Sequence, residues 1–285
     1  MGMPRRALTA LVCLVGGASL AVGCSLATSF DGLRDGAGEA GASADGGARE
    51  DVAAIDGSSD ARSDAATADS ADGAPKYAFA DTFDRPDTLT GLGNGWVTKT
   101  PSLRVSQNRA LRFLSGVRED YRNNVTFRPA TEAVRDVEVS TDVHFTVAMP
   151  FPQVHARVQP GSALSPDTLD CYILFLQDNS GASPVFKIVR QRGADFHVLL
   201  TQFSGPTKLT ASDVIRLKLR VQGSAPVVLS ASVEIQALGG FMPFASGGTV
   251  DTSEERIETP GVVGLSAEGE SSGAFAYDNF VATEL

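Results

Sequence analysis

The sequence predicts an all-β fold: a two-sheet antiparallel β-sandwich of the jelly-roll kind, preceded by a disordered N-terminal tether. Short runs with an apolar residue at every second position recur along residues 76–285, and turn residues separate them. No stretch of ten residues in this region keeps a convincing helical period. Roughly a dozen short strands spaced by turns are typical of sandwiches and jelly rolls.

The first residues of the chain have the layout of a secretory signal. A basic start with Arg5 and Arg6 precedes an uncharged apolar stretch at 7–20, and small residues then lead to Cys24. This stretch is shorter than the ~20 residues of a membrane-spanning helix. We therefore expect residues 1–23 to be a signal peptide rather than a buried helix.

The run Leu20-Ala21-Val22-Gly23-Cys24 resembles the lipobox of bacterial lipoprotein precursors, with Ala21 where that pattern prefers Leu. The resemblance implies that Cys24 is lipidated and becomes the new N-terminus, and Ser25 after it suits outer-membrane sorting. Several acyl chains give stable anchoring. Residues 25–33 also resemble the start of myxobacterial surface lipoproteins. We expect a cell-envelope protein, held in the outer membrane of a Gram-negative bacterium by its lipid.

Residues 24–75 are expected to be a disordered, acidic Ala/Gly/Asp/Ser linker. The segment 31–75 holds 9 Asp and 2 Glu against 3 Arg, so it carries most of the net charge of −10. It contains no aromatic residue and cannot bury enough apolar surface to offset its ordering entropy. Its irregular Asp spacing lacks the fixed order of a calcium loop. An acidic chain of this kind argues against a nucleic-acid partner.

The domain itself is expected to span residues 76–285. Its clearest strand is 137–147, where valines and Phe145 alternate with polar residues. The segments 214–221 and 227–235 form a predicted hairpin, in which Arg216, Lys218 and Arg220 face Ser and Glu residues on a wet surface. Further strands are predicted at 78–83, 103–106, 109–114, 124–128, 153–159, 171–177, 184–191, 195–202, 262–267 and 274–283.

Several residues are expected to be structural. Cys171 is the one cysteine left after the signal is removed and Cys24 is lipidated, and its apolar neighbours indicate a small buried residue in a central strand. Trp96, after a Gly-Asn-Gly turn, is expected in the core. The segment 237–253 is expected to be a loop. Its Phe241, Met242 and Phe244 are expected to plug the end of the sandwich, and the alternative is that they form an exposed contact patch.

Both ends of the domain resemble a known family. The segments 81–85 and 92–96 at the start, with 261–265 and 275–280 at the end, look like those of concanavalin A-like lectin/glucanase jelly rolls of the laminin G-like type. The hairpin at 214–235 fits the same family. The resemblance implies a sandwich with one curved sheet, whose members bind glycans, hydrolyse glycans or mediate adhesion. The fold alone does not choose among these activities.

No catalytic residue is predicted. Glycoside hydrolysis needs two carboxylates ~5–9.5 Å apart, and the nearest set is Asp136, Glu138 and Asp142, with Ser140 where the family's middle carboxylate would stand. An ordinary solvated strand face is favoured. The run 269–273 matches the G-x-S-x-G nucleophile elbow, but that motif requires a following helix, and a strand is predicted there.

Four residues are predicted to contact a glycan. Tyr172, Lys187, Arg190 and His197 lie on or beside three successive predicted strands, so they are expected to line a concave face. Single histidines in strand patterns, His197 among them, can equally be structural.

The resemblance further implies a calcium ion near the paired terminal strands. Asp278 occupies the family's position in Tyr-Asp-Asn-Phe, and Asp81 is expected to approach it, with backbone carbonyls completing the ligand set. A turn or cross-strand hydrogen bond from Asp278 is the equally weighted alternative.

Together these features predict a membrane-anchored surface lipoprotein with a non-catalytic, lectin-like domain that binds a glycan or another extracellular polymer. The alternatives are a divergent glycoside hydrolase or lyase of the glucanase type and a display or scaffold protein without a small ligand. Two carboxylates facing each other across a groove would favour the enzyme, and a filled or flat face would favour the scaffold.

Overall fold

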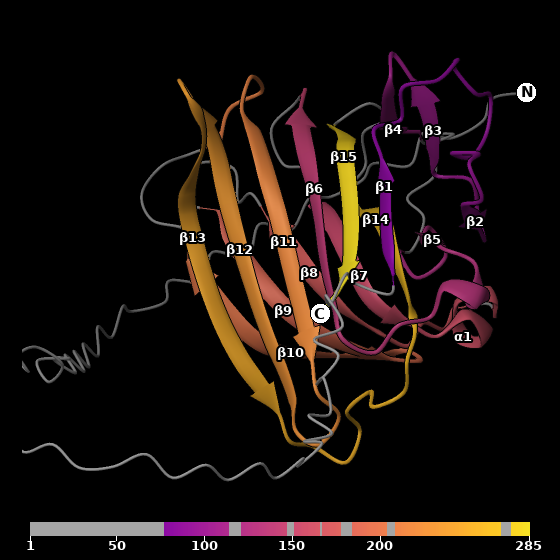
Figure 1. The fold of residues 1–285 in the computed structure, drawn as a ribbon, viewed down its shortest axis with the longest axis vertical. Coiled ribbons are helices and arrows are strands. Elements are labelled where there is room, and N and C mark those ends of the chain that lie inside the picture. The colour runs from indigo at the N-terminus through magenta and orange to yellow at the C-terminus, as the bar shows by residue number, and fades with distance from the viewer. Residues whose placement is uncertain are drawn as a thin grey trace, which may run out of the picture. The chain divides into compact units, whose positions relative to one another are not determined.

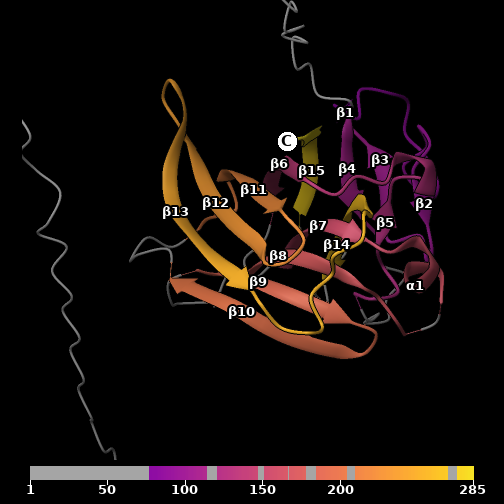
Figure 2. The same ribbon diagram turned by 60° about the horizontal axis from the view of Figure 1, so that its bottom comes forward.

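The computed structural model describes residues 77–113, 121–146, 151–165, 167–177, 184–203, 209–268 and 275–285. These residues form a sandwich of two β-sheets, in which the named strands pair in antiparallel fashion (Figures 1 and 2). The predicted fold class is confirmed. Helical structure is limited, within the described residues, to the five-residue helix α1 (Pro160–Leu164) and the 3-10 turn η1 (Ala130–Glu132).

Sheet A has eight strands in the order β13-β12-β11-β6-β15-β4-β3, and β1 also pairs with β15. Figure 1 shows most of these strands side by side in the front layer. Their bounds are β1 Ala78–Asp81, β3 Leu103–Ser106, β4 Arg109–Arg112, β6 Val137–Phe145, β11 Val214–Gln222, β12 Val227–Ala237, β13 Gly240–Asp251 and β15 Phe275–Glu284.

Sheet B has seven strands in the order β10-β9-β8-β7-β14-β5-β2. In Figure 2 its strands β8, β9 and β10 form a second layer that faces β11, β12 and β13. The bounds are β2 Val97–Thr98, β5 Thr126–Phe127, β7 Phe151–Val158, β8 Cys171–Gln177, β9 Val185–Arg192, β10 Asp195–Phe203 and β14 Val262–Glu268.

The described residues form two apolar clusters, one on each face of sheet B. The larger one lies between the sheets and includes the inward residues Val139, Leu217 and Leu174. The second lies on the other side of β8, where Ile173 packs with Ala163 of α1. Strand β8 is therefore covered on both faces, as its double-parity apolar run predicts, and such burial stabilises the fold by roughly 25 cal/mol per Å² of apolar surface.

The prediction of a loop at 237–253 was wrong, because Gly240–Asp251 forms the long edge strand β13, paired with β12 along its whole length. Its glycines and Pro243 indicate a loop in the sequence. An edge strand nevertheless tolerates such residues, because one of its sides has no hydrogen-bond partners. Pro243 lies beside a register shift at Val233/Glu234. The expected plug is only partly realised, since Phe244 packs against the core and Met242 is 57% exposed.

Trp96 and Cys171 are buried, which confirms both predictions. The predicted signal peptide, Cys24, the acidic linker and the G-x-S-x-G run at 269–273 lie outside the described residues. Within the described part of the chain, no helix has the length and apolar character needed to cross a membrane.

Candidate functional site

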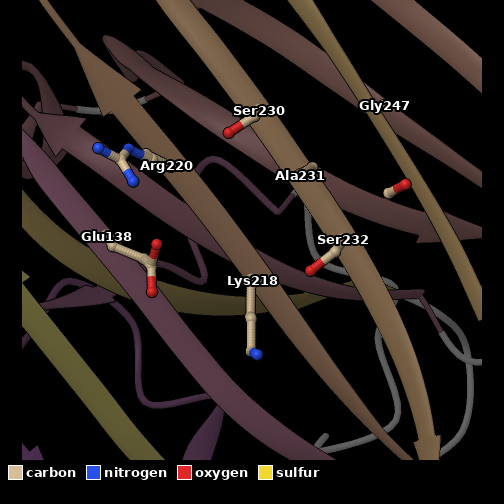
Figure 3. A pocket seen from close by; sticks show the side chains of 8 residues that line it. Glu138, Lys218, Arg220, Ser230, Ala231, Ser232 and Gly247 are labelled. Carbon is tan, nitrogen blue, oxygen red and sulfur yellow. The ribbon is translucent and has the colours of Figure 1, made fainter. Parts of the chain in front are cut away.

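The outward face of sheet A carries a groove of about 390 Å³, which we call the β11–β12 groove. Its lining comes from four neighbouring strands: Glu138 of β6, Lys218 and Arg220 of β11, Ser230, Ala231 and Ser232 of β12, and Ser246 and Gly247 of β13. Figure 3 shows the charged side chains of β6 and β11 on one side of it and the small residues of β12 and β13 on the other. This volume is in the range of sites that hold small ligands.

The alternation of the strands produces this groove. On β11, Leu217 and Leu219 point into the core, so Lys218 and Arg220 must point outward. The register places Arg220 opposite both Glu138 and Ser230. Serine and glycine on the two outer strands leave a hollow beside the long cationic side chains.

Two of the three β11 cations are held by carboxylates. Arg216 donates Nε to Asp142 Oδ1 at 2.6 Å and Nη2 to Asp142 Oδ2 at 3.0 Å. These hydrogen bonds raise the pKa of Arg216, against the opposing effect of its partial burial. Its guanidinium carbon also lies 4.0 Å from the centre of the Phe241 ring. Lys218 donates to Glu234 at 2.6 Å.

The remaining polar groups of the groove are open to a ligand. In the part of the chain that the structure describes, the Glu138 carboxylate and the hydroxyls of Ser230, Ser232 and Ser246 have no hydrogen-bond or ion-pair partner. Arg220 makes one long contact, from Nη2 to Gln222 Oε1 at 3.4 Å. The groove therefore presents one carboxylate, one guanidinium and three hydroxyls whose hydrogen-bonding capacity is available.

The same face continues toward Asp278 of β15, which lies opposite Asp142. Asp278 Oδ2 is 3.6 Å from His144 Nε2 and 3.7 Å from Arg109 Nε. Asn279 donates its side-chain amide to Asp142 at 2.9 Å. These contacts bind the polar residues of β4, β6 and β15 to one another.

The four predicted ligand residues do not share one face. Tyr172 is fully buried between the sheets, and Arg190 is 3% exposed; both hydrogen-bond to Asp251. Lys187 has the opposite parity and pairs with Phe175 on the outer side of sheet B. His197 is exposed on the edge strand β10, opposite Arg190. The prediction of a common concave surface is corrected by this placement, and ligand contact by Lys187 or His197 stays a prediction.

Asp81 does not offer a calcium site. Its carboxylate accepts hydrogen bonds from Arg85 at 2.6 and 3.0 Å and from Trp96 Nε1 at 2.8 Å. Burial alone would raise the pKa of Asp81, but the bonds from Arg85 and Trp96 outweigh it and hold the pKa below its usual value. The Arg85 guanidinium therefore already supplies the positive charge.

Asp278 likewise faces Arg109 and His144, and its Oδ1 accepts from the Asn279 N–H at 2.8 Å. No group of three or more His, Cys, Asp or Glu suited to a metal occurs within the described residues. Calcium prefers six to eight oxygens, so these two aspartates do not fit the ion that the family resemblance implies.

The carboxylates weighed for hydrolysis have different surroundings. Asp136 accepts from the Gly223 N–H at 2.8 Å and lies 3.4 Å from Arg157 Nη2, at the turn after β11. Asp142 is held by Arg216 and Asn279. Among the residues that line the groove, Glu138 is the one carboxylate. The two facing carboxylates that would favour a hydrolase do not appear in this lining.

No protein-family model matches the chain, and neither does any curated protein. The chain is similar to a xylan β-1,4-xylosidase from Bacillus halodurans C-125, with 14% identity and a TM-score of 0.47 over 72% of this chain and 39% of that one. It is also similar to a carbohydrate-binding module from Bacillus subtilis, with 11% identity and a TM-score of 0.40 over 67% and 96%.

An alginate lyase bound to an alginate tetrasaccharide shows 11% identity and a TM-score of 0.45 over 74% of this chain and 98% of that one. The matched part of the xylosidase is about two fifths of that protein's length. These likenesses are distant and concern the fold alone.

Proposed function

We propose that the sandwich binds a glycan in the β11–β12 groove and does not cleave it. The observation that carries this proposal is the open hydrogen-bonding capacity of the groove, where Glu138, Arg220 and the three serine hydroxyls lie around one hollow. Sugar hydroxyls donate and accept hydrogen bonds, and a carboxylate beside a guanidinium and hydroxyls matches both needs. The single carboxylate of the lining supports binding over hydrolysis, which uses two.

Filling the groove tests this assignment. Ser232→Trp places an indole in the hollow, and we expect it to weaken glycan binding by about tenfold or more, equivalent to ~1.4 kcal/mol. Gln236→Trp is the matched control, because Gln236 is exposed on the same strand and does not line the groove. The measurement is a glycan-array screen of the full chain in detergent, followed by titration of the best saccharide. Equal binding by the two variants would place the site elsewhere.

We further propose that this binding domain is displayed at the cell envelope as an outer-membrane lipoprotein. The support is the sequence: a basic start, an apolar stretch of signal length and a lipobox-like run that ends at Cys24. The acidic linker would then separate the domain from the membrane.

Anchoring predicts a specific mature product. Mass spectrometry of the chain expressed in a Gram-negative host should show an N-terminus at Cys24 with added acyl mass, in the membrane fraction. The Cys24→Ser variant should lack the acyl mass. An unacylated wild-type product in the soluble fraction would contradict the anchor while leaving the groove assignment intact.

A further inference from the structure

The free charges of the β11–β12 groove are balanced. Of the three cations of β11, Arg216 and Lys218 already face Asp142 and Glu234. Arg220 lies opposite Glu138 in the strand register, but the two side chains form no ion pair within the described residues. The groove therefore offers a ligand one carboxylate and one guanidinium that lie on neighbouring strands and form no ion pair with each other.

The carboxylate has the chemistry to select among saccharides. Two adjacent hydroxyls can each donate to one oxygen of Glu138, and hydrogen bonds to a charged acceptor are stronger than neutral ones. A uronate or sulfate group in the same place would instead meet a like charge. Specificity arises as much from such repulsion as from attraction.

Of the residues that line the groove, Arg220 alone offers an unpaired positive charge against this repulsion. The two cations of the lining are Arg220, which has no ion-pair partner within the described residues, and Lys218, whose ammonium donates to Glu234 at 2.6 Å. Ser230 and Ser232 are uncharged donors and acceptors that suit any hydroxyl. An acidic sugar would be attracted by Arg220 and repelled by Glu138. A neutral sugar can hydrogen-bond to both side chains.

We infer that the groove takes neutral, hydroxyl-rich oligosaccharides, and that Glu138 is the specificity-determining residue that rejects acidic ones. The inference rests on the glycan-binding function proposed above. It assigns Glu138 two tasks, accepting hydrogen bonds from neighbouring hydroxyls and repelling carboxylated or sulfated sugars.

The test compares neutral and acidic hexasaccharides on the full chain in detergent, with cellohexaose, xylohexaose and mannohexaose against hexagalacturonate and hexamannuronate. Dissociation constants are measured by calorimetry at low and high salt. For the wild type we expect at least one neutral sugar to bind about tenfold more tightly than any acidic one, with a preference that narrows as salt screens the repulsion.

Variants separate selectivity from simple loss of the site. Glu138→Gln should weaken neutral binding and strengthen acidic binding, reducing the preference by about tenfold or more. Glu138→Asp keeps the charge and should keep the rejection. Arg220→Gln should widen the preference, because it removes the attraction for anions. Melting temperatures confirm that each variant is folded.

The outcomes distinguish the two proposals. If the wild type prefers an acidic hexasaccharide, or if Glu138→Gln leaves the ratio of dissociation constants unchanged while Ser232→Trp still weakens binding, then the selectivity inference fails and the groove remains a glycan site. If no saccharide binds, or if binding is insensitive to Ser232→Trp, then the proposed function itself fails, and the inference that rests on it fails too.

Discussion

The free energy of unfolding is expected to fall by about 1.4 kcal/mol per pH unit as the pH drops from about 6.5 toward 3, because His155 is buried without charge. Burial lowers the pKa of His155 to about 3, from an ordinary value of 6.5. In the unfolded chain the imidazole takes up a proton near pH 6.5, whereas in the folded chain it does not until about pH 3. The stabilisation is thus complete above pH 6.5 and is lost as the pH falls.

The contacts of His155 explain why the folded protein keeps it neutral. Its Nε2 lies 2.6 Å from Ser266 Oγ, and its Nδ1 lies 3.4 Å from Cys171 Sγ. Both partners are uncharged, since burial raises the pKa of the Cys171 thiol well above its usual value. Gln153 accepts from Ser266 at 2.9 Å and completes the row. No carboxylate takes part in these contacts to favour an imidazolium.

Denaturant unfolding at pH 7, 6, 5 and 4.5 measures this slope. His155→Gln removes the titrating group, so its stability should be nearly flat over the same range, whatever its absolute value. His197→Gln is the matched control, because His197 is exposed on β10 and its removal should leave the wild-type slope unchanged. A slope that persists in His155→Gln would assign the pH dependence to other groups.

The strands of this domain could be predicted from the sequence because alternation is local. Apolar residues recur at nearly every second position of β6 and β11, and this pattern specifies which side of each strand faces the core. The prediction that the basic row of β11 faces Ser and Glu residues of β12 is confirmed, because the turn between these strands fixes their register. Strand β13 was not predicted, because an edge strand tolerates the glycine and proline residues that otherwise indicate loops.

The candidate site was harder to predict for a physical reason. Its hollow depends on side-chain size at facing positions of four strands, and β13, which supplies Ser246 and Gly247, reads as a loop. The alternation of polar and apolar residues also gives a wrong prediction where polar or charged side chains are buried. Tyr172 and Arg190 were expected at a ligand surface, but both point inward to Asp251, a partner 79 and 61 residues away.

That inward partner gives the second large effect, since Asp251→Ala should destabilise the fold by about 3–5 kcal/mol, the usual consequence of removing one partner of a buried ion pair. Asp251 is 2% exposed and Arg190 3%. The Asp251 carboxylate accepts from Arg190 Nη1 at 2.9 Å, from Tyr172 Oη at 2.9 Å and from Ser253 Oγ at 2.7 Å. Its loss removes the buried counter-charge of Arg190, whose remaining side-chain partners are Ser253 and the exposed Glu255. It also removes the acceptor of the Tyr172 hydroxyl.

Glu255→Ala is the matched control, because Glu255 also pairs with Arg190, at 2.8 Å, but its side chain is 72% exposed. An exposed ion pair contributes about 0–1 kcal/mol, so this variant should unfold almost as the wild type does. Denaturant unfolding at pH 7 compares the two. Similar losses in both variants would show that Arg190 is accessible to water and that Asp251 is not its essential partner.

The stability lost in Asp251→Ala should depend on pH in a different range from the His155 effect. Burial alone would raise the pKa of Asp251, but hydrogen bonds from Ser253, Arg190 and Tyr172 outweigh it and hold the pKa below its usual value. Its contribution is therefore present above the ordinary carboxyl pKa of about 4 and is lost as the pH falls below it. The difference in free energy of unfolding between wild type and Asp251→Ala should stay constant from pH 7 to 5, because His155 destabilises both proteins equally in that range. The difference should narrow only below about pH 4. A gap that narrows already between pH 6.5 and 5 would mean that the two buried groups are coupled.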